Sequence, residues 1–226
     1  MFFVGVKFLN KLRVIKKKEK MKPKLIIGIL LILILGSCNS GYQKENNKWV
    51  WISYDEAVGK RISQIDEHDV KTFKILRSSN YAVDKNSVFY VGRKIKDADP
   101  NSFEVINQSG YSKDKEFVFL DDKKVIFANP NTFKVLEFPY SKDDENLFCG
   151  TIPLEINKDE VEEFQVTNED KLMSGTKSSF LLSYFIERNP DYEWLDTLGI
   201  NGVIVGEWAT GKTNGKKFIG FKELKE

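Results

Sequence analysis

Aromatic residues recur through the middle of this chain at intervals of about 30 residues. One landmark is a phenylalanine, and the other is a tyrosine followed three residues later by an aspartate. The phenylalanines are Phe73, Phe103, Phe133 and Phe164, and the pairs are Tyr81 with Asp84, Tyr111 with Asp114 and Tyr140 with Asp143. Because two independent landmarks keep one period, we predict tandem supersecondary units.

Within each unit, apolar and polar residues alternate as in a strand with one buried face. Phe73–Ile75 shows this pattern, and a second apolar run such as Val88–Tyr90 follows a short polar turn. An Asx residue before the phenylalanine, as in Asp99–Pro100, suits the cap of a single helical turn. One unit cannot bury its apolar face alone. We therefore expect a mainly β fold of tandem hairpin repeats, either a solenoid-like stack or a curled meander sheet.

The best copy of the repeat is Tyr81–Tyr90, with the sequence Tyr-Ala-Val-Asp-Lys-Asn-Ser-Val-Phe-Tyr. Together with Ala98–Pro100 ahead of Phe103, it resembles the DKNN repeat family of bacterial envelope proteins. The resemblance covers residues 62–166, although the Asp-Lys-Asn signature is intact only in this copy. The family has no assigned activity, so the resemblance implies an uncharacterised repeat module and supplies no mechanism.

Residues 21–37 predict a lipoprotein signal peptide. Lys22 and Lys24 precede an apolar run from Leu25 to Leu35, which is shorter than the roughly 20 residues of a permanent spanning helix. Residues 35–38, Leu-Gly-Ser-Cys, resemble the lipobox of bacterial lipoproteins, which implies cleavage before Cys38 and lipid, with its palmitate chains, on that thiol. Residues 1–20 precede Met21 and are either a long basic leader or a misassigned start, of which we favour the second.

Removal of this signal changes the sign of the net charge. The whole chain carries +2, and residues 1–37 contribute +8 through nine Lys or Arg against one Glu, which leaves −6. A basic nucleic-acid footprint is thus absent from the exported part. We expect an extracytoplasmic protein, anchored to the cell membrane or the outer membrane through the lipid on Cys38.

The chain is expected to divide into a signal region at 1–37, a lipidated N-terminus and tether at 38–48, a repeat domain at 49–166 and a mixed α/β C-terminal cap at 167–226. Trp49 and Trp51 are expected to cap the repeats, with an exposed ligand platform as the alternative. After Val166 we expect the repeat to stop. Residues 178–188 predict either a short helix or a buried strand, residues 191–198 a helical turn, and residues 202–205 a strand.

Gly206–Thr213 matches the Walker A pattern of nucleotide-binding proteins. That chemistry needs a helix starting at Lys212 and an acidic magnesium-binding strand further on. Asn214–Gly215 instead favours a hairpin turn, and only 13 residues follow Thr213. We therefore expect a hairpin tip and no bound nucleotide.

The remaining candidate residues favour structural roles. Cys149 takes the repeat position of Tyr90 and Leu120, so we expect it in the core. His68, the only histidine, is expected in an exposed turn, and the acidic runs 121–122 and 143–145 are expected to be solvated hairpin tips rather than calcium loops.

We assign no catalytic, cofactor-binding or metal-ligating residue. The expected function is a non-enzymatic binding or structural module for an envelope protein or glycan. The alternative is an envelope enzyme whose site lies in residues 167–226.

Overall fold

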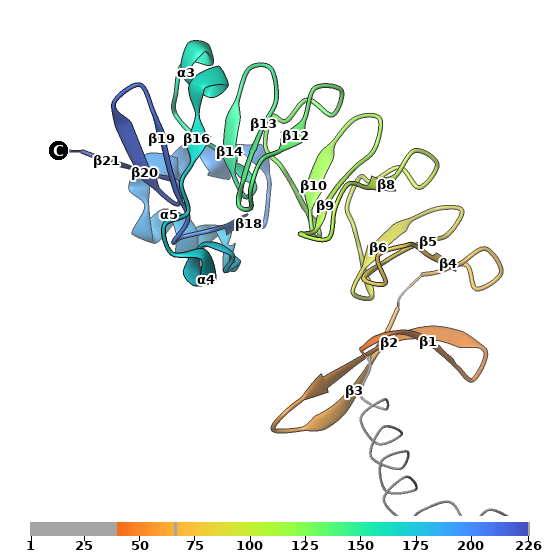
Figure 1. Ribbon diagram of the computed structural model, residues 1–226. Helices are drawn as coiled ribbons and strands as arrows, with labels where there is room; N and C mark the ends of the chain where they lie inside the picture. Colours follow the sequence, from red (N-terminus) through yellow and green to blue (C-terminus); the bar gives the residue numbers. More distant parts are fainter. Residues whose placement is uncertain (1–39, 66, 226) are drawn as a thin grey trace, which may run out of the picture.

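The computed structural model describes residues 40–65 and 67–225 of the chain. It forms a curved row of small antiparallel sheets, with the N-terminal sheet at one end and the C-terminal sheet at the other (Figure 1). Six sheets are present in these residues and none closes on itself. The predicted mainly β repeat fold is confirmed, and of its two forms the open stack is the one observed.

Three consecutive units fold as four-stranded meanders. The first contains β4 (Lys74–Ile75), β5 (Tyr81–Val83), β6 (Val88–Tyr90) and β7 (Arg93–Lys94); the second contains β8 (Glu104–Val105), β9 (Tyr111–Lys113), β10 (Val118–Leu120) and β11 (Lys123–Lys124); the third contains β12 (Lys134–Val135), β13 (Tyr140–Lys142), β14 (Leu147–Cys149) and β15 (Ile152–Pro153). In every unit the tyrosine pairs with the last residue of the third strand, which is Tyr90, Leu120 or Cys149. The equivalences predicted from the sequence are therefore correct.

The repeated phenylalanines occupy equivalent places between units. Each packs against the tyrosine of the preceding unit and a phenylalanine of its own unit, with ring centroids 4.9 to 6.1 Å apart. The four triples are Tyr42–Phe73–Phe89, Tyr81–Phe103–Phe119, Tyr111–Phe133–Phe148 and Tyr140–Phe164–Phe218. Each aromatic pair contributes about 0.5–1.5 kcal/mol beyond the area it buries, so these triples form a ladder that joins the units.

The tyrosine hydroxyls of the three units fix the order of the stack. Each donates a hydrogen bond to a carbonyl of the following unit, and the ring that carries it is at most 1% exposed. The pairs are Tyr81 to Gly110 at 2.6 Å, Tyr111 to Pro139 at 2.9 Å and Tyr140 to Gly220 at 2.9 Å. Since a buried hydroxyl needs a partner, each tyrosine holds its neighbour in one register.

The N-terminal sheet contains β1 (Gly41–Glu45), β2 (Lys48–Asp55) and β3 (Gly59–Gln64). Tyr42 supplies the tyrosine ahead of Phe73, and its hydroxyl accepts a hydrogen bond from the Gly92 N–H at 3.0 Å. The predicted tether at 38–48 is therefore wrong for residues 41–45. These polar residues form a strand because pairing with β2 satisfies their backbone and Tyr42 enters the core.

The two early tryptophans cap the first unit, as predicted. Trp49 stacks on Phe73 with ring centroids 5.1 Å apart, and Trp51 belongs to the apolar cluster around that phenylalanine. Gly92 lies directly beneath Trp51 with φ of +80°, and a Cβ at Gly92 would lie 2.8 Å from the Trp51 Cβ. Glycine is required there both for the left-handed turn and for the close approach.

The repeat continues beyond Val166, contrary to the sequence prediction. β16 (Gln165–Val166) pairs with β19 (Thr210–Thr213), which is followed by β20 (Lys216–Ile219) and β21 (Lys222–Leu224). This strand order is that of the other units, and Phe218 takes the place of Phe148. The end of the chain therefore completes a fourth unit that residues 167–209 interrupt.

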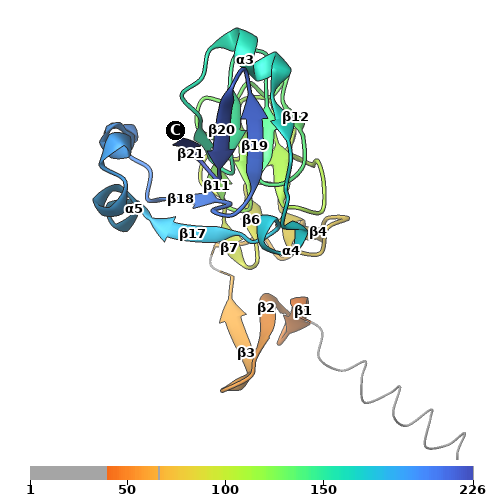
Figure 2. The same ribbon diagram turned by 60° about the vertical axis from the view of Figure 1, so that its left-hand side comes forward.

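The insertion of residues 167–209 covers one side of the stack (Figure 2). It contains α4 (Lys171–Ser174), β17 (Ser178–Leu181), α5 (Leu182–Arg188), the 3-10 helix η1 (Pro190–Leu198) and β18 (Gly202–Val205). β18 lies against β11 and β15, and the Ile204 carbonyl accepts the Thr151 N–H at 2.7 Å. Residues 178–188 form both a strand and a short helix, but the strand β17 is not buried as predicted, since its residues are half-buried or exposed. The predicted η1 turn and β18 strand are confirmed.

The turn before each repeated phenylalanine is capped by an Asx residue, as predicted. Asp69 illustrates it: Oδ1 accepts the Lys71 and Thr72 N–H groups at 2.9 and 3.0 Å. In the fourth unit the turn lengthens into α3 (Lys158–Glu163), where Asn157 and Glu160 form a capping box. The largest apolar cluster lies beside α3 and joins the third unit, the fourth unit and the insertion.

Candidate functional site

The repeated aspartates bind their own backbone and are buried. In the second unit, Asp114 Oδ1 accepts the N–H groups of Glu116 and Phe117, both at 2.7 Å, and Oδ2 accepts the Asp99 N–H at 2.9 Å. Asp84 and Asp143 repeat this arrangement in the first and third units. The expectation of a solvated tip is therefore wrong for Asp143, because three amides replace its water. The aspartate is therefore the residue of the Asp-Lys-Asn signature that this turn requires.

Asp121 is also buried rather than solvated. Both of its oxygens accept hydrogen bonds from the Lys177 ammonium group, at 2.8 and 2.9 Å. Lys177 belongs to the insertion, so this ion pair ties the insertion to the second unit. Asp122, the next residue, forms an ion pair with Arg93 of the first unit at 3.3 Å. The acidic pair therefore holds parts of the stack together.

His68 is half-buried, which corrects the expectation of an exposed turn. Its Nδ1 lies 2.6 Å from the Ile65 carbonyl oxygen, and its Nε2 lies 3.2 Å from the Trp49 backbone nitrogen. An Nδ1–H donor and an Nε2 acceptor satisfy both contacts. The ring thereby links the N-terminal sheet to the first unit, and Phe73 lies against its edge.

Cys149 lies in the core, as predicted, and is fully buried. Burial raises the pKa of its thiol from 9.0 to about 12. Because the thiolate is the nucleophilic form, this cysteine is chemically inert at neutral pH.

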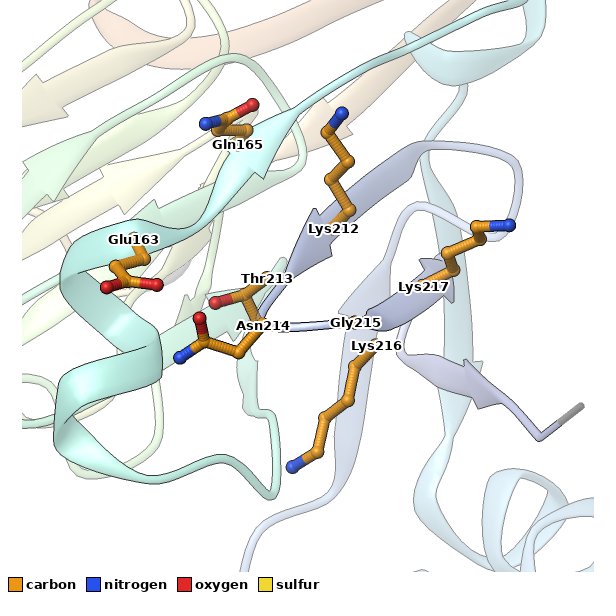
Figure 3. A pocket seen from close by; sticks show the side chains of 8 residues that line it. All are labelled: Glu163, Gln165, Lys212, Thr213, Asn214, Gly215, Lys216 and Lys217. Atoms are coloured by element: carbon orange, nitrogen blue, oxygen red, sulfur yellow. The ribbon is translucent and has the colours of Figure 1, made fainter.

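A pocket of about 440 Å³ lies beside the hairpin formed by β19 and β20 (Figure 3). The residues that line it are Glu163, Gln165, Lys212, Thr213, Asn214, Gly215, Lys216 and Lys217. Three lysines in one pocket would suit an anionic group, and its size is ordinary for a small-molecule site. Six of these residues fall in the C-terminal segment, where the sequence places the alternative enzymatic site.

The charged groups of this pocket do not converge on one point. Lys216 and Lys217 leave β20 on opposite sides (Figure 3), as successive strand residues do. The Lys216 ammonium lies 2.9 Å from a Glu160 carboxylate oxygen. The hydrogen bond from Lys216 lowers the pKa of Glu160, and the same bond raises the pKa of Lys216. Both pKa values therefore move away from neutral pH, whereas a general acid or base works best with a pKa near the operating pH.

The Walker A match forms a hairpin, as predicted. Thr210–Thr213 is β19, and Lys216–Ile219 returns as β20 with Thr213 opposite Lys216. The Thr213 hydroxyl donates to the Glu160 backbone carbonyl at 2.9 Å, so it is engaged in the fold and does not have the role of a magnesium ligand. Gly211 has a packing role, since a Cβ there would lie 2.1 Å from the Phe164 ring. No helix begins at Lys212, so the phosphate-binding geometry of a P-loop is not formed.

Across residues 40–65 and 67–225, no group of three or more His, Cys, Asp or Glu side chains is placed to hold a metal ion. No helix in the same ranges is long and apolar enough to cross a bilayer. The proposed lipidation residue, Cys38, lies outside the described residues, as does the signal region 1–37.

The sequence missed the residues that complete the outer units of the stack. Tyr42 lies 39 positions before Tyr81, outside the period, and Phe218 lies beyond the insertion. In the fourth unit, Thr210 and Thr213 replace the tyrosine and the aspartate that mark the other units. The turn at Asn214–Gly215, flanked by strands, was the one available signal of this last hairpin.

Comparison with known proteins gives one family. The model of the DKNYY family matches residues 42–184, which is more than half of the chain. No curated protein and no solved structure matches the chain.

Proposed function

Because this chain belongs to the DKNYY family, a repeat family of the kind expected from its sequence, we propose a function that the repeat itself performs. The protein is a lipid-anchored component of the cell envelope, held at its membrane by the lipid on Cys38. There it acts as a non-enzymatic binding or structural module. Its partner is an envelope protein or glycan.

This proposal rests on the observation that the recurring residues pack and form hydrogen bonds within the fold. The recurring tyrosines, phenylalanines and aspartates are buried or partly buried and contact one another or the backbone, as described above, so the recurring residues form a scaffold. One recurring position that faces water in all four units is the first residue of the first strand. Its four copies are Lys74, Glu104, Lys134 and Gln165. One exposed polar side chain per unit, with a different identity in each, makes a surface that a long partner can read.

Capture of a partner from envelope extracts tests the binding role. The membrane-anchored full chain is expected to retain one envelope component, and the double substitution Lys74→Glu with Lys134→Glu to release it. Lys171→Glu is the matched control, because it reverses an exposed lysine of α4 outside this row. If no component is retained, or if the control releases it equally, the proposed surface is wrong.

Metabolic labelling with palmitate tests the anchor separately. The wild-type chain is expected to carry the label and to fractionate with membranes. Cys38→Ala is expected to lose both properties. Label that persists in Cys38→Ala would refute acylation at this residue.

The second candidate is an envelope enzyme with its site in residues 167–226. The pocket lined by Lys212, Lys216 and Lys217 favours it, although its charged groups diverge. If this candidate is correct, incubation of the protein with envelope peptide or glycan fractions releases a product that mass spectrometry detects. That product would disappear in Lys212→Ala.

A further inference from the structure

We propose that the tip of the β2–β3 hairpin rests on the surface of the bilayer that holds the anchor. This inference rests on the proposed acylation of Cys38, and it identifies the folded element that meets the lipid. Three observations carry it: the short chain between Cys38 and β1, the register of the N-terminal sheet, and the apolar side chains exposed on the hairpin.

The distance between the anchor and the folded chain is short. Only Asn39 and Ser40 separate Cys38 from Gly41, the first residue of β1. Three steps along a fully extended chain span at most about 11 Å. A lipid on Cys38 therefore holds the start of β1 within about 11 Å of the lipid headgroups.

The register directs the hairpin tip toward the same side of the sheet as the anchor. Gly41 pairs with Ile52, and Ile52 pairs with Ile62 on β3. From this row β2 continues three residues to Asp55, which pairs with Gly59. The tip therefore extends beyond the start of β1 by about 10 Å, at roughly 3.3 Å per residue. This length of about 10 Å is close to the maximum span of about 11 Å from Gly41 to Cys38. The tip can therefore reach the same depth as the lipid-bearing Cys38.

The hairpin also points away from the repeats. In both views it projects from the end of the stack, and α3 lies on the far side of the molecule (Figures 1 and 2).

The side chains of the hairpin suit the interface between lipid and water. Val58 at the tip is 65% exposed, Ile62 is 47% exposed and Tyr54 is 38% exposed. Turn-forming polar residues are usual at a hairpin tip, and an exposed valine there is unfavourable because its apolar surface is hydrated. Tyrosine is enriched at the headgroup level of membrane proteins because its ring is amphipathic.

Apart from the exposed Glu56, the charges beside these apolar groups are already partnered. Arg61 forms an ion pair with Asp55 at 3.2 Å, and Lys60 forms one with Glu45 at 3.2 Å. Asp55 also accepts the N–H groups of Ala57 and Val58, which satisfies the backbone of the turn. The tip therefore approaches lipid with little unpaired charge, which lowers the cost of its partial dehydration.

A fluorescent label at the tip tests the inference. The full chain carrying Val58→Cys is expressed in a bacterial host that acylates lipoproteins, purified from membranes, labelled with a thiol-reactive environment-sensitive dye and placed in phosphatidylcholine vesicles. The new thiol alone reacts, because Cys149 is fully buried and the Cys38 thiol carries lipid. Lipids brominated in the upper acyl chain are expected to lower the emission at least about twofold, since interfacial segments lie roughly 5–10 Å deep.

Asp159→Cys in α3 is the matched control, because Asp159 is exposed on the far side of the molecule. Its label is expected to keep its emission on the same vesicles. Acylated protein whose tip label is no more quenched than the control label would overturn the hairpin inference and leave the anchor intact. Protein whose mass lacks the lipid would instead refute the anchor, and the hairpin inference with it.

Discussion

At the scale of single residues, the repeat signature is a set of hydrogen-bonding requirements. A tyrosine hydroxyl must reach a carbonyl of the next unit. An aspartate must accept two backbone N–H groups of its own turn and a third from the turn before the phenylalanine of the same unit. Sequence reasoning found the positions of these residues from their period. It predicts that Asp143 and Asp121 are solvated, because the position of a residue in the sequence does not show which groups its side chain contacts.

Tyr111→Phe tests the hydroxyl ladder. The change removes the Tyr111 donor to the Pro139 carbonyl, which keeps its hydrogen bond from the Gly150 N–H at 2.8 Å. We expect the free energy of unfolding to fall by about 0.5–1.5 kcal/mol in urea titrations, the contribution of one buried hydrogen bond. Tyr184→Phe is the control, because Tyr184 is exposed and its hydroxyl accepts a hydrogen bond from the exposed Arg188 side chain at 2.8 Å. A change of less than about 0.5 kcal/mol is expected there, and equal effects would contradict the ladder.

At the scale of elements, the sequence predicts the hairpins well and the interruptions poorly. Local alternation and turn residues are sufficient for β5 with β6 and for β19 with β20. β16 pairs with β19 across 43 intervening residues. This pairing depends on tertiary packing, which local sequence patterns do not show. The tether was misassigned for the same reason: the polar composition of 41–45 hides a strand whose partner is β2.

Phe218→Ala tests whether the C-terminal hairpin is an integral unit. Phe218 is 3% exposed and packs on Phe164, so its removal leaves a cavity at the centre of the fourth unit. We expect a loss of about 3–5 kcal/mol in the free energy of unfolding. Ile219→Ala alters the next residue of β20, whose side chain is 39% exposed, and is expected to cost less than about 1 kcal/mol. If both substitutions cost equally little, the hairpin is an independent appendage.

At the scale of the whole molecule, the carboxylates of the turns set the response to acid. The hydrogen bond and charge of Lys85 lower the pKa of Asp69 from 3.8 to about 2. Backbone and side-chain hydrogen bonds lower the pKa of Asp99, and the Thr132 hydroxyl lowers the pKa of Asp144. Since these pKa values are lower in the folded state, the stabilisation is complete above about pH 4 and is lost as the pH falls toward 2.

The midpoint of urea unfolding is therefore expected to be constant from about pH 5 to 8 and to fall steadily below pH 4. Asp69→Asn removes one of the contributing carboxylates, so it should reduce the steepness of this fall. Asp196→Asn, at an exposed position of η1, should leave the acid response unchanged. A midpoint that is independent of pH down to 2 would show that these carboxylates do not stabilise the fold.

The fold class and the stacking of the units can be predicted from the sequence, because both depend on the period of about 30 residues. The anchor, the partner and the membrane contact of the β2–β3 hairpin depend on surfaces, which a single sequence describes only by composition. Tyr54, Val58 and Ile62 illustrate the limit: each is unremarkable in the sequence, and their common exposure is visible only in the folded hairpin.

Native-state hydrogen exchange, read by mass spectrometry of peptides, tests the central claim most directly. If four equivalent units form one stack, the peptide that spans β19 and β20 is protected to the same degree as the peptide that spans β13 and β14, because both hairpins open only with the stack. Exchange of the β19–β20 peptide at the rate of a frayed terminus, beside a protected β13–β14 peptide, would contradict the four-unit account.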